Sequence, residues 1–415
     1  MGSDAASVVS AVWRRESVRL IAGLARMTGD LELAEDLAQD ALVAALEQWP
    51  AEGIPRNPGA WLMSVAKRRA VDQFRRADTL RRRTAELGHA LEERDMPDLD
   101  AAVDHIEDDV LRLMFLACHP VLSPESRAAL TLRLVGGLTT QEIARAFLVK
   151  DATVGQRISR AKKALAGVDV DPPVGRERQE RLDDVMSVIY LVFNEGYSAT
   201  AGPDWTRPEL CQEALRLARM LADLAPGEPE AHGLQALLEL QASRLPARSG
   251  PDGRPVLLEA QDRRRWDRLL IRRGYAALDR AGALGKPVGP YVLQAALAAC
   301  HARARTPADT DWVRIADLYD LLAAAAPGAV VEVNRAVAHG RAFGPAAGLA
   351  VLDAVDDPAL TDSHLLHSVR GDLLARAGRA DEAAAAFREA ARRTRNEQER
   401  SLLLARAKEQ AAPTG

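Results

Sequence analysis

Apolar side chains recur at helical spacing along much of the chain, and beyond residue 175 no strand-like alternation of apolar and polar residues occurs. This pattern predicts an all-α protein. It is clearest in residues 132–165, where a short amphipathic helix at 139–147 precedes a longer one at 151–165. The first opens with a possible cap at Thr139, and the turn between them carries Leu148 where Gly is common. Together they predict a helix-turn-helix whose turn is packed by an apolar side chain.

The second helix has the two faces expected of a DNA-reading helix. It opens with an acidic cap at Asp151, and its apolar face carries Val154, Ile158, Ala161 and Leu165. Its opposite face carries hydrogen-bond donors: Gln156, Arg157, Arg160 and Lys163. Donors that project away from the core suit a reader of the major groove. The alternative is a solvated amphipathic helix pair.

A second basic segment lies upstream, at residues 59–83, and holds eight basic residues against two acidic ones. Its buried stripe is predicted to contain Leu62, Val65, Ala66, Arg69 and Gln73. A basic surface beside aromatic residues suits a phosphate backbone and unstacked bases. We expect Trp61 and Phe74 to anchor the core and the cations to face the nucleic acid.

An acidic helix at residues 30–42 precedes the basic one. Leu33, Leu37 and Ala41 are predicted to lie inside. Its outer face is expected to carry Glu32, Glu35, Asp36, Gln39 and Asp40. Because such a face repels DNA, we expect it to bind a basic protein surface.

Residues 86–109 carry ten acidic side chains and a single arginine, which predicts an extended linker. Helices are expected to resume at 110–118 and after a cap at Ser123. Proline and glycine at 169–175 predict a domain boundary.

The rest of the chain is rich in Ala and Leu and predicts helix pairs. Small and large residues resemble a tetratricopeptide repeat at Gly371, Leu374, Gly378, Ala383, Phe387 and Ala390. Looser copies precede it, around 336–355 and 214–226. Small residues let paired helices approach while Phe or Leu fills the gap, so each unit buries its face on the next. An unrelated helical bundle is the alternative.

No nucleophile is paired with a base, and no phosphate loop or metal-ligand spacing is present, so we expect no catalytic residue, metal or cofactor. Cys118-His119 and Cys300-His301 lie too far apart in sequence to suggest a shared metal ion. These cysteines and Cys211 are expected to be buried thiols.

Three cysteines in 415 residues, no long apolar run and no signal peptide predict a cytoplasmic protein with no membrane partner. The net charge of −4 does not exclude a DNA-binding protein, because the local field at the two basic segments governs DNA contact.

Three segments taken in order resemble one family: AEDLAQDAL, then PGAWLMSVAKRRAVDQFRR, then LRLVGGLTTQEIARAFLVKDATVGQRISRAKKAL. They are similar to the extracytoplasmic-function sigma factors of bacterial RNA polymerase, of the sigma-70 family. Later segments, among them 184–198 and 257–267, look like a branch of these factors with a long tetratricopeptide-like C-terminal extension. The resemblance implies two partners, core RNA polymerase, through its β′ clamp and β flap, and promoter DNA.

The resemblance also implies site residues. The polymerase would be bound by Asp36, Gln39 and Asp40. The melted −10 strand would lie along Lys67, Arg68, Arg69, Asp72, Arg75 and Arg76. The −35 duplex would be read by Thr153, Gln156, Arg157, Arg160 and Lys163.

We therefore expect two small helical sigma domains, the second a helix-turn-helix, followed by an α-helical repeat domain. Region 2 would occupy residues 8–84, the acidic linker 85–109, region 4 110–168 and the C-terminal regulatory domain 176–410. That last domain would tune promoter recognition and could bind a protein or a small molecule. The alternatives are a stand-alone helix-turn-helix regulator with a ligand- or peptide-binding repeat domain, and a scaffold that presents peptide grooves.

Overall fold

The computed structural model describes residues 2–85, 106–147, 149–168, 173–198, 205–250, 254–355 and 363–411. The chain forms two compact units, Met1–Val188 and Ile189–Gly415. Among the described residues, all regular secondary structure is helical. The sole β-type pairing there is an isolated bridge between Ser249 and Pro255. The predicted all-α fold class is confirmed. Leu148 and most of the predicted linker lie outside the described residues.

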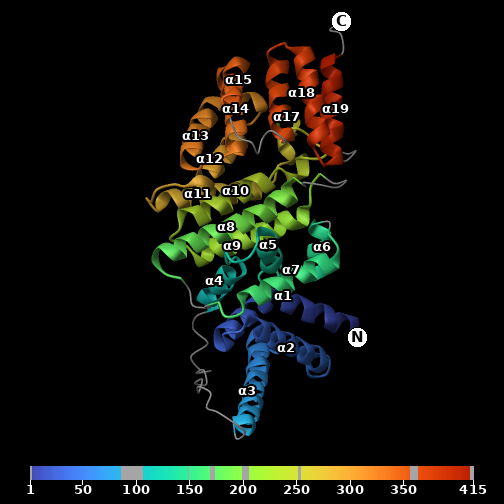
Figure 1. Ribbon diagram of the computed structural model, residues 1–415, viewed down its shortest axis with the longest axis vertical. Helices are drawn as coiled ribbons and strands as arrows, with labels where there is room; N and C mark the ends of the chain where they lie inside the picture. Colours follow the sequence, from blue (N-terminus) through green and yellow to red (C-terminus); the bar gives the residue numbers. More distant parts are fainter. Residues whose placement is uncertain are drawn as a thin grey trace. The chain divides into compact units, whose positions relative to one another are not determined.

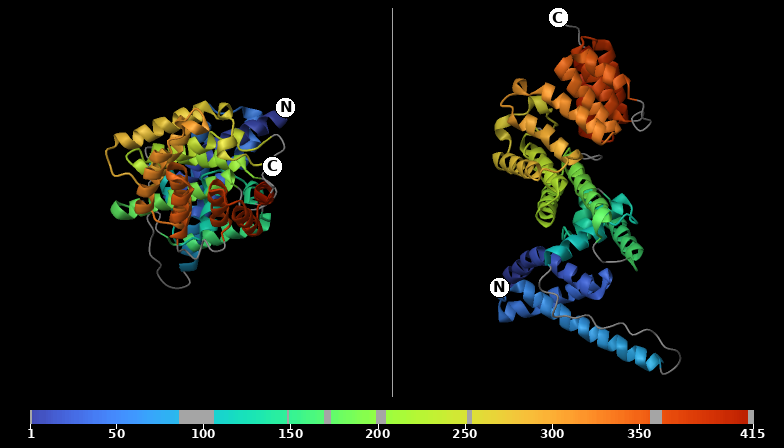
Figure 2. Two further views of the ribbon diagram at one scale, coloured as in Figure 1. Left: turned by 90° about the horizontal axis from the view of Figure 1, so that it is seen from above. Right: turned by 90° about the vertical axis from the view of Figure 1, so that its left-hand side faces the viewer.

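The first unit begins with three helices, α1 (Gly2–Thr28), α2 (Leu31–Glu52) and α3 (Pro58–Ala85). Asp30 caps α2, because its carboxylate accepts hydrogen bonds from two backbone N–H groups of the first turn. Trp49 and Trp61 meet edge to face with ring centroids 5.3 Å apart, so Trp61 joins the packing between α2 and α3. Figure 2 shows the C-terminal half of α3 extending away from α1 and α2.

The buried stripe of α3 differs from the predicted one. It carries Leu62, Val65, Ala66 and Ala70. Arg69 is half-buried and Gln73 is exposed, so their assignment to the stripe was wrong. The buried stripe runs from Ala66 to Ala70, four residues later, and not to Arg69, three residues later. Arg69 therefore lies at the side of the helix.

Four helices complete the sigma-like part: α4 (Ile106–Ala117), α5 (Pro124–Leu134), α6 (Thr140–Phe147) and α7 (Asp151–Leu165). Ser123 caps α5 as predicted, accepting a 3.3 Å hydrogen bond from a backbone N–H. Thr139 and Glu142 form a reciprocal capping box before α6. The predicted cap of α7 was wrong, because Lys150 is the N-cap residue and Asp151 is the first residue of the helix. The negative charge of Asp151 still stabilises α7 by interacting with the positive end of the helix dipole.

α8 (Gly175–Tyr197) begins in the first unit and ends in the second. The second unit continues with α9 (Pro208–Leu224), α10 (Pro229–Ala242), α11 (Arg268–Ala283), α12 (Pro290–Arg303), α13 (Trp312–Ala325), α14 (Ala329–Phe343), α15 (Pro345–Asp353), α17 (His364–Arg376), α18 (Ala380–Arg393) and α19 (Glu397–Ala411). Short 3₁₀ turns connect some of these helices, including one at Pro307–Asp309. Figure 1 shows successive helices of this unit packed side by side.

Small residues allow close packing of these helix pairs, as the repeat pattern predicts. A Cβ on Gly371 of α17 would lie 2.7 Å from the ring of Phe387 of α18, and Phe387 is fully buried. In the preceding pair, a Cβ on Gly348 of α15 would lie 2.8 Å from the Cα of Gly340 in α14. Larger side chains at these positions would push the helices apart, so the sequence pattern and the packing agree.

Candidate nucleic-acid and polymerase interfaces

The recognition-helix candidate α7 has the two faces predicted for it. Its buried face holds Val154, Ile158, Ala161 and Leu165. Thr153 and Arg157 are half-buried at its other side, and Gln156, Arg160 and Lys163 are exposed. The cations Arg157, Arg160 and Lys163 form no ion pair with any residue in the described part of the chain. Their donors therefore remain available to an external acceptor.

Lys162 on the same helix has a different role. Its Nζ lies 2.7 Å from the carboxylate of Glu35 in α2, and Arg133 of α5 lies 3.4 Å from the other oxygen of that carboxylate. The Glu35 side chain is 6% exposed. Glu35 was predicted to lie on the outer face of α2, and this was wrong, because α5 and α7 cover it with two cations. A charge buried in this way is stable only when paired.

A second ion pair joins the same two parts of the first unit. Arg26 of α1 lies 2.8 Å from Asp109 of α4, whose side chain is 2% exposed. The helix-turn-helix part is therefore held against α1 and α2 by two sets of charges. No local pattern indicates either set of ion pairs, because the partners lie far apart along the chain.

The basic helix α3 carries the residues expected along the −10 strand. Arg68 is exposed, with its Nε donating to the Ser64 carbonyl oxygen at 3.3 Å, and Lys67 is half-buried. Asp72 and Arg75 are exposed. Arg76 lies within α3, but its side chain is outside the described residues.

Arg69 joins this helix to the acidic one. Its guanidinium lies 2.9 Å from the carboxylate of Asp40, and both side chains remain partly exposed. Asp36 and Gln39 are exposed on the same face of α2 as Asp40. The side-chain amide of Gln39 donates a 3.4 Å hydrogen bond to Glu35. The acidic surface of α2 and the basic surface of α3 therefore meet at Asp40 and Arg69.

Among the described residues, no group of three or more His, Cys, Asp or Glu side chains is placed to hold a metal ion. Burial raises the pKa of Cys118 to about 12, so its thiol stays protonated. Cys211 is buried as well, as expected. The prediction was wrong in part for Cys300, which is half-buried and lines a cavity in the second unit.

Three family models match the chain. Sigma-70 region 2 matches residues 13–79, Sigma-70 region 4 matches residues 112–165, and a family of unknown function, DUF6596, matches residues 181–282. The first match falls on α1 to α3 and the second on α4 to α7. The two regions stand in the order that defines a transcription initiation factor.

Two curated relatives match the chain over different lengths. The "Uncharacterized protein R00370" of Rhizobium meliloti is 46% identical over 373 residues, which cover 88% of this chain and 86% of that protein. The probable ECF RNA polymerase sigma factor SigI of Mycobacterium tuberculosis is 30% identical over 164 residues, which cover 38% of this chain and 54% of that protein. A tetratricopeptide repeat protein from Parabacteroides merdae covers 65% of this chain and 98% of its own, at 15% identity and a TM-score of 0.34, which is too low to indicate a shared fold.

The chain belongs to the sigma-70 family, as an extracytoplasmic-function-type sigma factor with a long helical C-terminal extension. Such factors bind core RNA polymerase and promoter DNA and are not enzymes. The match with the Rhizobium protein spans the extension as well as the sigma regions. Among the described residues, no helix is both long and apolar enough to cross a membrane.

Proposed function

We propose that this sigma factor directs core RNA polymerase to specific promoters through three surfaces of its first unit. Asp36, Gln39 and Asp40 on α2 bind the β′ clamp. The cations of α3, with Asp72, hold the melted −10 strand. On α7, Thr153, Gln156, Arg157, Arg160 and Lys163 read the −35 duplex while region 4 rests on the β flap. The observation that carries the proposal is the division of charge between exposed acids on α2 and the cations Arg157, Arg160 and Lys163 on α7, which have no ion-pair partner among the described residues.

The proposed domain bounds are region 2 at residues 8–84, an acidic linker at 85–109, region 4 at 110–168 and a C-terminal domain at 176–410. Residues 106–109 of the linker already belong to α4, so the structure begins this helix earlier than the predicted 110. The linker has to let the two DNA-binding regions reach separate stretches of promoter, and its self-repelling charge favours an extended chain. The family matches at 13–79 and 112–165 support the two sigma regions.

The C-terminal domain tunes the activity of the sigma regions in this proposal, through a protein or small-molecule partner. Support comes from its covalent attachment and from the Rhizobium relative, in which sigma regions and extension occur together. A domain on the same chain is always present at high effective concentration. Even a weak interaction of this domain with the sigma regions would therefore change promoter binding.

The polymerase-binding face is tested by charge reversal in the full chain. Asp36→Lys combined with Gln39→Lys places cations where the proposal needs a face complementary to a basic clamp, so binding to purified core polymerase is expected to be lost. Asp40 is left intact because it pairs with Arg69. Glu52→Lys is the matched control, since Glu52 is exposed at the far end of the same helix. Unchanged binding of the double variant, or equal loss in the control, would contradict the assignment.

A further inference from the structure

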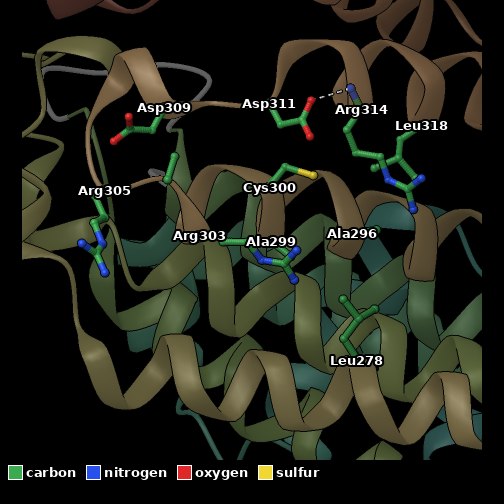
Figure 3. Close-up of a pocket in the computed structure, with 11 residues that line it drawn as sticks. Leu278, Ala296, Ala299, Cys300, Arg303, Arg305, Asp309, Asp311, Arg314 and Leu318 are labelled. Atoms are coloured by element: carbon green, nitrogen blue, oxygen red, sulfur yellow. Dashed lines mark hydrogen bonds between the residues drawn. The ribbon is translucent and has the colours of Figure 1, made fainter.

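A cavity of about 490 Å³ lies in the second unit between α11, α12 and α13 (Figure 3). Its apolar lining comes from Leu278, Ala296, Ala299 and Leu318. Cys300 lies among these residues, and burial raises the pKa of its thiol, so it adds no negative charge. The volume falls in the range of roughly 300 to 1,000 Å³ that small-molecule sites occupy.

The rim of this cavity is cationic. Arg303 comes from the last turn of α12, Arg305 from the connection that follows, and Arg314 from the first turn of α13 (Figure 3). All three side chains are exposed. None of them forms an ion pair with another residue in the described ranges. Three guanidinium groups around one concave surface are suited to a carboxylate or phosphate.

The two acidic residues of the lining accept hydrogen bonds from residues close to them in sequence. One oxygen of Asp309 accepts hydrogen bonds of 2.9 Å from both the backbone N–H and the hydroxyl of Thr306, and these bonds lower the pKa of Asp309. Asp311 caps α13 by accepting the backbone N–H of Arg314 at 2.9 Å (Figure 3). Both carboxylates therefore shape the connection between α12 and α13, and the three arginines outnumber them.

Arginines near the end of a helix can also serve its C-terminal carbonyl groups. Here a different arginine does so: the buried Arg263 donates to the carbonyl oxygens of His301 at 2.6 Å and of Ala304 at 2.7 Å. Arg263 thus holds the C-terminal end of α12, which forms part of the cavity wall. Arg303, Arg305 and Arg314 are not needed for that role.

We infer that this cavity binds a small organic anion. Its carboxylate or phosphate group binds at the cationic rim formed by these arginines, while an apolar portion covers the lining around Leu278 and Leu318. The site is preformed, because backbone hydrogen bonds and Arg263 hold its walls. The inference concerns binding by this cavity and stands whether or not the second unit tunes transcription.

The test is isothermal titration calorimetry on the full chain with phenyl phosphate and benzoate, which combine an apolar ring with either of the two anionic groups. Phenol and inorganic phosphate serve as the separate halves. We expect at least one ring-bearing anion to bind more tightly than either half. Binding by phenyl phosphate alone identifies a phosphate ligand, and binding by benzoate alone a carboxylate. If neither ring-bearing anion binds, the inference is overturned.

Variants locate the binding. Arg303→Gln combined with Arg314→Gln is expected to weaken it by about tenfold or more, because charge-assisted hydrogen bonds are lost. Arg272→Gln combined with Arg273→Gln removes two exposed charges from α11 outside the cavity and is expected to leave binding unchanged. Ala296→Phe, which adds a ring to the partly exposed lining, should block binding without altering charge. Wild-type affinity in the Arg303/Arg314 variant, or an equal loss in the Arg272/Arg273 control, would overturn the inference.

Discussion

Individual cations on α7 have different structural roles although they are adjacent in sequence. Lys162 is bound to the buried Glu35, whereas Arg160 and Lys163 are exposed and unpaired among the described residues. The difference follows from the helical period, which turns successive residues to different sides. A mutation series on this helix therefore has to separate residues that hold the fold from those that face DNA.

Arg157→Ala and Arg160→Ala test the base-reading role. If these side chains contact base edges, each substitution should cost about 1 to 3 kcal/mol of discrimination between a cognate and a scrambled −35 sequence. The measurement is promoter affinity of the polymerase holoenzyme at fixed salt. Equal losses on cognate and scrambled sequences would reduce both residues to phosphate contacts.

At the scale of elements, the contact of α2 with α5 and α7 depends on Glu35. Glu35→Gln removes a charge that two cations neutralise. We expect the free energy of unfolding to fall by about 1 to 3 kcal/mol, since the charge-assisted bonds are lost while Lys162 and Arg133 regain some water.

Urea denaturation of the full chain measures this change, with Asp36→Asn as the control. Asp36 is the exposed neighbour of Glu35 on the same helix, so its substitution should stay within about 0.5 kcal/mol of the wild type. A Glu35→Gln variant as stable as the Asp36→Asn control would show that the buried ion pairs contribute nothing to the packing of these helices.

Local signals predicted the elements well. The cap at Thr139, the cap at Ser123 and the apolar face of α7 could all be predicted from neighbouring residues, because each depends on contacts within a few positions. Glu35 was misplaced since its burial depends on α5 and α7, which no local pattern reports. The cavity beside Arg303 was missed for the same reason: its lining comes from three helices and a connecting turn.

At the scale of the whole molecule, the sigma regions and the extension share α8. Arg127 of α5 forms a 2.9 Å ion pair with Asp184 in the N-terminal half of α8. Truncation after Leu165 therefore removes more than the second unit, because it also deletes a partner of the first. The experiment on the extension has to account for this contact.

Truncation after Leu165 is expected to change transcript yield in a reconstituted assay if the C-terminal domain tunes activity. Full-length Asp184→Asn is the matched control, since it removes the ion pair and keeps the extension; its yield should stay close to wild type. Circular dichroism checks that both proteins remain helical. Identical yields from the truncated and full chains would mean that the extension does not tune this step.

Run-off transcription with purified full-length protein, core RNA polymerase and a library of promoters tests the central claim most directly. The division of charge among α2, α3 and α7 predicts RNA that starts at defined sites, depends on added protein and is lost when the −10 or the −35 sequence is scrambled. RNA synthesis that is absent, or that starts at the same sites without the protein, would contradict the account.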